Sequence, residues 1–304
     1  MISIIIPTYH RTAMLIEHLT FLQSELNTFE YEVIVVNDAK DVDVILPLHL
    51  SEFSVINNPK SGVASARNFG AAHAKYQWLL FVDDDMKMGR ADFENYLERT
   101  SSENINFTIN LDWKYSDETN LELTKTSFGR FLLSISYNTL AGWNNLSSWP
   151  KTGLLEHNGL ASCNLLIHKT IFEKVNGYDE QFSHAGAEDF EFSQRILKAG
   201  VKTYIDNRSQ MIHNELDRLS KKAWFKRKYQ AGITNRIAYE KGYEEVLIPK
   251  NWKYKSPIIT NNLCKSVLFF TERTKLLDRI SFMCYKLLLG QALNAGFYHK
   301  KQAF

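Results

Sequence analysis

The sequence predicts an α/β fold in which helices flank a central, mostly parallel sheet. Two observations predict it. The first 82 residues alternate short apolar segments, rich in Ile, Val and Leu, with segments of helical periodicity, as in sheets that are covered on both faces. Polar or acidic residues directly follow three of the apolar segments. Because ligands of such sheets bind beyond the carboxyl ends of the strands, we expect the functional site at this edge.

The N-terminal half shows this alternation in order. Residues 12–26 place apolar side chains at helical spacing behind Thr12, a candidate cap, and residues 62–74 are rich in alanine, which favours a helix. Strands are expected at 2–6, 31–36, 55–56 and 78–82. No G-x-G-x-x-G sequence follows the first strand and the chain has no P-loop sequence, so another set of loops would have to hold a nucleotide.

The second half is less regular between residues 105 and 155, where Trp113, Trp143, Trp149 and Tyr137 would either stack on sugar rings or fill a core. Beyond it we expect further elements in this order: a strand at 159–168, a helix at 169–175, an amphipathic helix up to Gly200, strands at 202–205 and 211–212, a basic helix from about 221 to Gly242, and an amphipathic helical segment from Ser256.

The composition suits one large domain or one domain with an appendage. The chain has 304 residues, of which 44% are apolar and 13% aromatic, enough for a filled core. Its three cysteines are far apart, which argues for a reducing compartment and against a thiolate zinc site. The sequence has no signal-peptide pattern and no apolar run near the ~20 residues of a membrane span. We therefore expect a cytoplasmic protein.

Charge is distributed unevenly along the chain. Residues 1–216 contain 18 Lys and Arg and 28 Asp and Glu, a balance of −10, whereas residues 217–304 contain 18 and 6, a balance of +12. A basic segment after an acidic body indicates an anionic partner. The last part of this segment, an amphipathic helix, would either pack on the body or lie in the interface of a bilayer.

The acidic triplet Asp83, Asp84 and Asp85 is the first candidate for chemistry. It follows directly after the apolar residues 78–82, and three adjacent carboxylates repel one another unless a cation compensates them. Mg²⁺ and Mn²⁺ prefer carboxylate oxygens and leave coordination positions for phosphates. The alternative is an acidic turn in solvent, which is the ordinary environment of a charge run.

Two later features are weaker candidates when taken alone. Glu188 and Asp189 begin an amphipathic helix, where acids are also expected simply because the helix dipole favours negative charge. His213 follows a short apolar segment, and a lone histidine is more often a surface or core residue than a ligand.

Taken together, the ordered motifs resemble inverting glycosyltransferases of family 2, which have the GT-A fold. The resemblance spans residues 1 to about 240 and is carried by the segments 4–9, 35–38, 62–70, 81–85, 177–180 and 186–189 together with His213. The part from Gly177 to His213 looks like hexosamine-transferring domains of the chondroitin-polymerase type. Asn37, Ala39 and Ala187 depart from the residues that are usual in the family.

The resemblance implies nucleotide-binding roles for seven residues: Pro7, Thr8, Tyr9, Asp38, Arg67, Asp83 and Asp84. Asp38 would pair with the base, taken as uracil. Asp85 and His213 would bind the divalent cation, Mn²⁺ or Mg²⁺. Asp189 would be the general base, with Glu188 near the acceptor or donor sugar.

The implied activity is transfer of a sugar, as a UDP-linked hexose or N-acetylhexosamine, to a hydroxyl of a glycan or lipid-linked acceptor. Residues 1–242 would form the GT-A domain, with a nucleotide-binding half to about 104 and an acceptor-binding half beyond. Residues 243–304 would form a helical C-terminal extension that contacts the inner face of the membrane peripherally. No module for nucleic acid accompanies the basic segment. A sugar nucleotidyltransferase and a catalytically weak protein that only binds nucleotide sugars are the alternatives.

Overall fold

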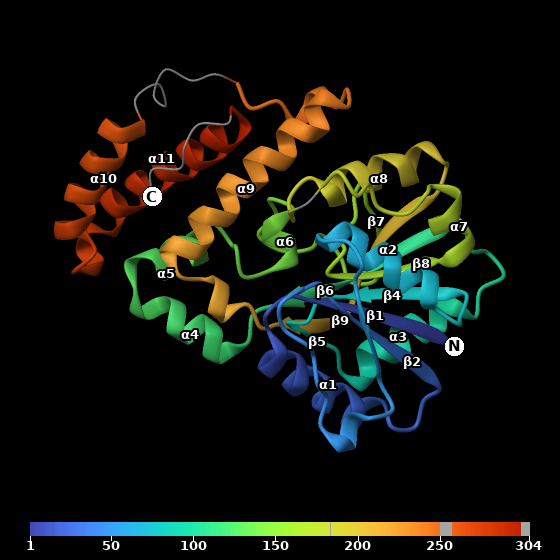
Figure 1. Cartoon of the computed structure of the whole chain (residues 1–304). Coiled ribbons are helices and arrows are strands. Elements are labelled where there is room, and N and C mark those ends of the chain that lie inside the picture. The colour runs from blue at the N-terminus through green and yellow to red at the C-terminus, as the bar shows by residue number, and fades with distance from the viewer. Residues whose placement is uncertain (183, 250–256, 299–304) are drawn as a thin grey trace. The chain divides into compact units, whose positions relative to one another are not determined.

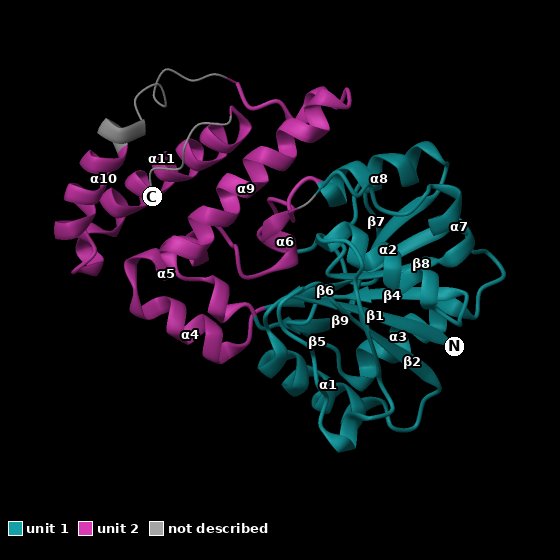
Figure 2. Cartoon of the chain, viewed as in Figure 1, with its two compact units in different colours: residues 1–114, 149–183, 188–214 teal, residues 115–148, 184–187, 215–304 magenta. Residues whose placement is uncertain are grey.

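The computed structural model describes residues 1–182, 184–249 and 257–298. These residues form two compact units, shown in different colours in Figure 2. Unit 1 comprises residues 1–114, 149–183 and 188–214, and unit 2 comprises residues 115–148, 184–187 and 215–304. Each unit is therefore assembled from segments that are distant in the sequence.

The sheet of unit 1 has nine strands within the described residues, in the order β3-β2-β1-β4-β8-β6-β9-β5, with β7 paired to β9. Strands β3, β2, β1 and β4 are parallel, as the first 82 residues predict. Beyond β4 the sheet is mixed, because β8 runs antiparallel to both β4 and β6 while β6 and β9 are parallel. The strands are β1 Ile2–Thr8, β2 Tyr31–Asn37, β3 Ser54–Asn57, β4 Trp78–Val82, β5 Met86–Lys87, β6 Phe107–Lys114, β7 Leu154–Glu156, β8 Asn164–His168 and β9 Lys202–His213.

Helices cover both faces of this sheet, with α2, α7 and α8 on one face and α1 and α3 on the other (Figure 1). On the first face a buried cluster joins Ile5 of β1 and Phe81 of β4 to Phe172 of α7 and Phe192 of α8. On the second, Phe93 of α3 packs edge-on against Tyr31 of β2. The helices of unit 1 are α1 Thr12–Leu26, η1 Leu48–Leu50, α2 Val63–His73, α3 Arg90–Thr100, α7 Lys169–Lys174 and α8 Glu188–Lys198.

Three expected strands differ in the structure. The strand expected at 159–168 begins only at Asn164, and the segments expected at 202–205 and 211–212 are parts of the single strand β9. The polar residues that interrupt β9 in the sequence lie at an irregularity, where the register with β6 shifts between Leu111 and Asp112. Asp206, in this polar stretch, is buried and accepts a hydrogen bond from Arg99 at 3.0 Å.

Unit 2 is helical in the residues that the structure describes. Its elements are α4 Asp117–Lys125, α5 Ser127–Ser134, α6 Leu140–Trp143, η2 Leu216–Arg218, α9 Lys221–Glu240, η3 Glu244–Val246, α10 Pro257–Thr271, η5 Lys275–Leu277 and α11 Asp278–Phe297. The helical segment expected from Ser256 is thus two helices joined by a turn, and Ser256 itself lies outside the described residues. Phe128 and Phe131 of α5 pack against Trp224 of α9 and Tyr285 of α11 to form an aromatic core.

Helices α9 and α11 approach each other closely at two glycines. A Cβ atom on Gly232 would overlap the carbonyl oxygen of Leu293, and one on Gly296 would overlap that of Tyr229. These positions therefore accept no larger side chain without a shift of one helix. Over the described part of the chain, no helix is both long and apolar enough to span a bilayer.

Candidate active site

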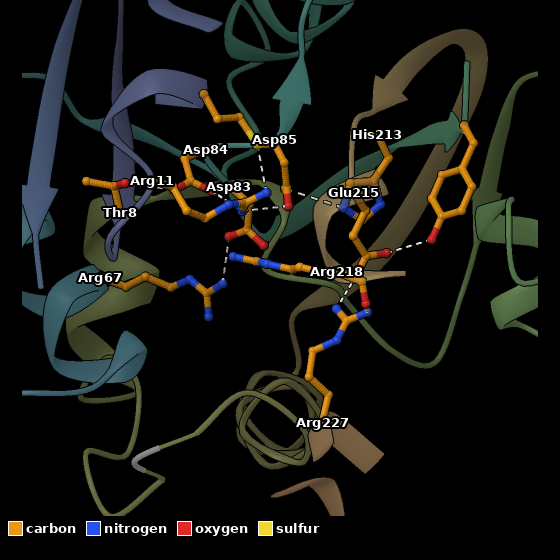
Figure 3. A network of polar contacts seen from close by, with 12 residues as sticks. Thr8, Arg11, Arg67, Asp83, Asp84, Asp85, His213, Glu215, Arg218 and Arg227 are labelled. Atoms are coloured by element: carbon orange, nitrogen blue, oxygen red, sulfur yellow. Dashed lines mark hydrogen bonds and ion pairs between the residues drawn. The ribbon is translucent and has the colours of Figure 1, made fainter. Parts of the chain in front are cut away.

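The acidic triplet lies just beyond the carboxyl end of β4, and two of its members are buried. Asp84 and Asp85 are 3% and 1% exposed, which excludes an acidic turn in solvent. Arg11 donates hydrogen bonds to Asp84 at 2.5 Å and to Asp85 at 2.8 Å, and Thr8 donates to Asp84 at 2.7 Å (Figure 3). The last residue of β1 and the connection that follows it thereby hold the acids of the neighbouring strand in place.

His213 lies next to Asp85, with 3.4 Å between its Nε2 atom and a carboxylate oxygen. The two-residue strand β5 creates this proximity, because it pairs Met86 directly with His213. The indole ring of Trp113, which is fully buried, meets the imidazole edge-on with 4.7 Å between ring centroids. Trp113 is therefore a core residue that orients His213, and it does not present a face to sugar.

Asp85 and His213 form a pair of donors that suits a divalent cation. Two adjacent ligands of Mg²⁺, each about 2.1 Å from the ion, lie roughly 3 Å apart, close to the separation observed here. Among the described residues, no group of three or more His, Cys, Asp or Glu side chains could hold a metal ion. A cation bound by Asp85 and His213 would take its other ligands from phosphate oxygens and water, the usual arrangement for Mg²⁺.

Arg67, which projects from α2, connects the end of β4 to the start of α8. It is 3% exposed and donates to Asp83 at 3.0 Å, while its other terminal nitrogen lies 3.6 Å from Glu188 and 4.0 Å from Asp189. Burial alone would lower the pKa of Arg67, but the surrounding acids outweigh it and raise that pKa. The guanidinium is therefore a permanent positive charge shared by three carboxylates.

Asp189 lies in the first turn of α8, and its carboxylate accepts two hydrogen bonds from Ser162. One comes from the backbone N–H at 3.1 Å and the other from the hydroxyl group. The side chain keeps 29% of its surface exposed. Burial raises the pKa of Asp189, and Arg67 and Ser162 only partly oppose this rise. A carboxylate that is held in one orientation, partly open to solvent and more basic than usual suits proton abstraction.

Tyr178 contacts both Ser162 and Arg67 and so helps to fix the two residues that contact Asp189. Its hydroxyl pairs with the Ser162 hydroxyl at 2.6 Å, and its ring lies 5.3 Å from the Arg67 guanidinium. The backbone of Tyr178 is fixed by Asn68 of α2, whose side chain exchanges two hydrogen bonds of 2.8 Å with it. The loop after α7 is thereby tied to α2, the helix that carries Arg67.

The residues that were expected to bind the nucleoside lie at the carboxyl ends of β1 and β2. The Asp38 carboxylate accepts the backbone N–H of Gly62 at 3.0 Å and thus caps α2. Pro7 is buried in β1, where its missing N–H is tolerated because pairing with β4 ends at Ile5. Tyr9 is 59% exposed. These positions leave the roles of Pro7, Thr8, Tyr9 and Asp38 toward a nucleoside as predictions.

Three members of the site were not identified from the sequence: Arg11, Ser162 and Tyr178. A basic residue just after the first strand, in a sheet whose neighbouring strand ends in acids, could have pointed to Arg11. Ser162 carries no such signal. Tyr178 lies in the segment 177–180 that carries the family resemblance, but its link to Asp189 through the Ser162 hydroxyl depends on how β8 and α8 pack.

The family model described as "Glycosyltransferase like family 2" matches residues 3–235. The chain belongs to this family. The predicted family and the α/β class are thus confirmed. The match includes most of β1, the acidic triplet, Arg67, the start of α8 and His213, so it covers every residue of the site described above.

Curated relatives cover part of the same region. A chondroitin synthase of Pasteurella multocida is 26% identical over 239 residues, which are 70% of this chain and 25% of that protein. An uncharacterized glycosyltransferase of Haemophilus influenzae is 37% identical over 212 residues, which are 65% of this chain and 62% of that protein. The chain therefore spans about a quarter of the length of the first relative.

Solved structures show the same fold at low sequence identity. A mannosyltransferase from Pyrobaculum calidifontis, in complex with GDP-Man and Mn²⁺, superposes with a TM-score of 0.56 and 14% identity. The superposition covers 96% of this chain and 86% of that one. This likeness confirms the GT-A architecture.

Proposed function

We propose that this family 2 protein transfers a sugar from a nucleotide sugar to an acceptor hydroxyl by a single displacement that inverts the anomeric centre. The observation that carries the proposal is the Arg67 network. It joins Asp83, at the end of β4, to Glu188 and Asp189, at the start of α8. The two acidic motifs, about a hundred residues apart, thus belong to one cluster of charges.

Asp189 acts as the general base in this proposal. Its carboxylate is fixed by Ser162 and open to solvent on its remaining surface, so it can take the proton of an incoming hydroxyl. Inversion needs one such base, whereas a retaining displacement through the enzyme would need a second, nucleophilic carboxylate. Arg67 keeps Asp189 oriented and adds a positive charge where a diphosphate leaves.

Asp85 and His213 would hold Mn²⁺ or Mg²⁺, which would act as a Lewis acid toward the leaving diphosphate. Asp83, Pro7, Thr8, Tyr9 and Asp38 would contact the nucleotide, the role that the sequence also predicted for Asp84. Buried Asp84 is engaged by Thr8 and Arg11, so it contributes chiefly by positioning its acidic neighbours.

The donor is a UDP-linked hexose or N-acetylhexosamine, and the acceptor is a glycan or a lipid-linked saccharide. A relative named chondroitin synthase supports a role in building a glycan. If the acceptor is lipid-linked, the reaction takes place at the inner face of a membrane, and the basic C-terminal region would contact that membrane peripherally.

A panel of nucleotide sugars tests the proposal. The protein is incubated with each donor and Mn²⁺, and release of the nucleoside diphosphate is measured. We expect one UDP-sugar to be turned over, with loss of turnover in the presence of a chelator. Calorimetric binding of UDP without turnover of any donor would favour the binding-protein alternative, and release of pyrophosphate from UTP with a sugar phosphate would favour a nucleotidyltransferase.

A further inference from the structure

Large apolar side chains are exposed at one end of unit 2, on α10, the turn after it and α11. Leu276 is 92% exposed, Phe270 66% and Phe269 60%. Three further side chains belong to the same group: Leu263, Ile280 and Met283, which are 64%, 45% and 66% exposed. Exposed apolar clusters of this kind mark interaction sites in soluble domains.

The spacing of these residues places them on the outer faces of both helices. In α10, Leu263 and Phe270 lie two helical turns apart on one face, and in α11 Ile280 and Met283 lie one turn apart, while Arg273 and Leu276 belong to the connection between the two helices. The opposite faces are already packed, since Leu268 and Leu288 are buried and Ser281 donates a buried hydrogen bond to Thr271 at 2.8 Å. The exposed apolar residues are therefore additional to the core of unit 2.

Basic side chains surround the apolar ones. The segment 257–297 has five basic residues, Lys265, Arg273, Lys275, Arg279 and Lys286, all of them exposed, and two acidic ones. Both acids are directed to partners within unit 2: Glu272 accepts from Lys221 and Tyr285, and Asp278 accepts from Arg130 at 2.6 Å. The outer surface is thus apolar and positively charged.

We propose that this surface docks on the interface of an anionic lipid bilayer. We call it the hairpin face, and it consists of Leu263, Phe269, Phe270, Arg273, Lys275, Leu276, Arg279, Ile280 and Met283. The apolar side chains enter the boundary between headgroups and acyl chains, and the cations contact lipid phosphates, as interfacial amphipathic helices do. Arg273 lies over the ring of Phe269 with 4.6 Å to its centroid. The Arg273 guanidinium can therefore contact lipid phosphates while it stays packed on an aromatic ring at the apolar boundary.

Charge and shape favour a bilayer over other partners. A second copy of the chain would bring two positive surfaces together across a twofold axis, and like charges oppose such an interface. A nucleic acid would satisfy the cations but would leave Leu276, Phe270 and Met283 in water. A bilayer with anionic headgroups accommodates both kinds of side chain at once. Docking does not depend on the proposed reaction, since it needs neither sugar donor nor metal.

Vesicle co-sedimentation of the full chain tests the docking. Vesicles of phosphatidylcholine alone are compared with vesicles of equal parts phosphatidylcholine and phosphatidylglycerol. We expect pelleting with the anionic vesicles that weakens as salt is raised. The double variant Phe269→Ser/Phe270→Ser should lower the partition coefficient at least about tenfold, and Lys275→Glu/Arg279→Glu should lower it roughly fivefold or more for each charge.

A matched control uses exposed apolar residues of unit 1. Ile45 and Leu48 are 78% and 90% exposed, so Ile45→Ser/Leu48→Ser removes comparable surface and should leave pelleting unchanged. Circular dichroism checks that each variant is folded. Equal pelleting of the wild type and the hairpin variants would overturn the proposal. So would a dimer of the wild type that the Phe269→Ser/Phe270→Ser change converts to a monomer, because the face would then be an interface between copies.

Discussion

Replacement of Asp189 by asparagine isolates the proposed general base with little change in shape. The amide keeps the size of the carboxyl group and one of its two acceptors. Ser162 donates to both oxygens of Asp189, but its hydroxyl also pairs with Tyr178 and can therefore turn to accept from the amide. Arg67 retains Asp83 at 3.0 Å and Glu188 at 3.6 Å, so it does not become an uncompensated charge.

The expected loss is large for turnover and small for stability. A positioned general base contributes typically about 10²–10⁴ in rate, and this is the factor by which kcat should fall. The ion pair of Asp189 with Arg67 spans 4.0 Å and is partly exposed, so its loss should cost roughly 1 kcal/mol or less of unfolding free energy. Affinity for UDP should be unchanged, since Asp189 faces the acceptor in the proposed arrangement.

The pH dependence supplies a second measurement on the same variant. Burial raises the pKa of Asp189 above that of an ordinary aspartate, and a base works only when deprotonated. Wild-type kcat should therefore rise with pH through this raised pKa and fall away below it. The asparagine variant should lose this acidic limb while it keeps any other pH dependence.

The assay is release of UDP from the donor that the nucleotide-sugar panel identifies, with calorimetry for UDP affinity and thermal melting for stability. Glu191→Gln is the control, because Glu191 is another acid in the first turn of α8 whose partner is Arg195. It should retain turnover within a few-fold if the effect is specific to the base. Near wild-type kcat in Asp189→Asn, or an equal loss in Glu191→Gln, would refute the assignment.

Three further predictions concern charge and packing. Arg11→Gln should lower the melting temperature in the absence of divalent cations and enlarge the rise on adding Mn²⁺, because the buried acids at the end of β4 lose a compensating charge; an unchanged rise would contradict this. Glu215→Gln should cost about 2–3 kcal/mol in chemical denaturation, less than a fully buried pair because Arg227, its partner in Figure 3, keeps 31% of its side chain exposed. Gly232→Ala should cost about 1–3 kcal/mol through overlap with Leu293, and a neutral result would show that α9 and α11 separate easily.

Local patterns in the sequence were enough for the parallel half of the sheet. Helix α1 and strand β4 have the expected bounds, 12–26 and 78–82, because apolar periodicity is a property of neighbouring residues. Prediction was weaker after residue 105, where antiparallel partners enter the sheet. Strand β9 was predicted as two segments because polar residues interrupt its apolar pattern. The register irregularity beside Asp112 accommodates these polar side chains within one strand.

By itself, the sequence determined the family, the fold class and the chemical types at the site. An uncharged strand that ends in Asp83, Asp84 and Asp85 marks a functional edge wherever that strand lies in the sheet. Only the tertiary structure decided which distant residues meet these acids. His213 reaches Asp85 through a two-residue pairing of β5 with β9, and Arg67 reaches Asp189 through the packing of α2 beside α8. Such contacts depend on strand order and helix placement, which no short stretch of sequence encodes.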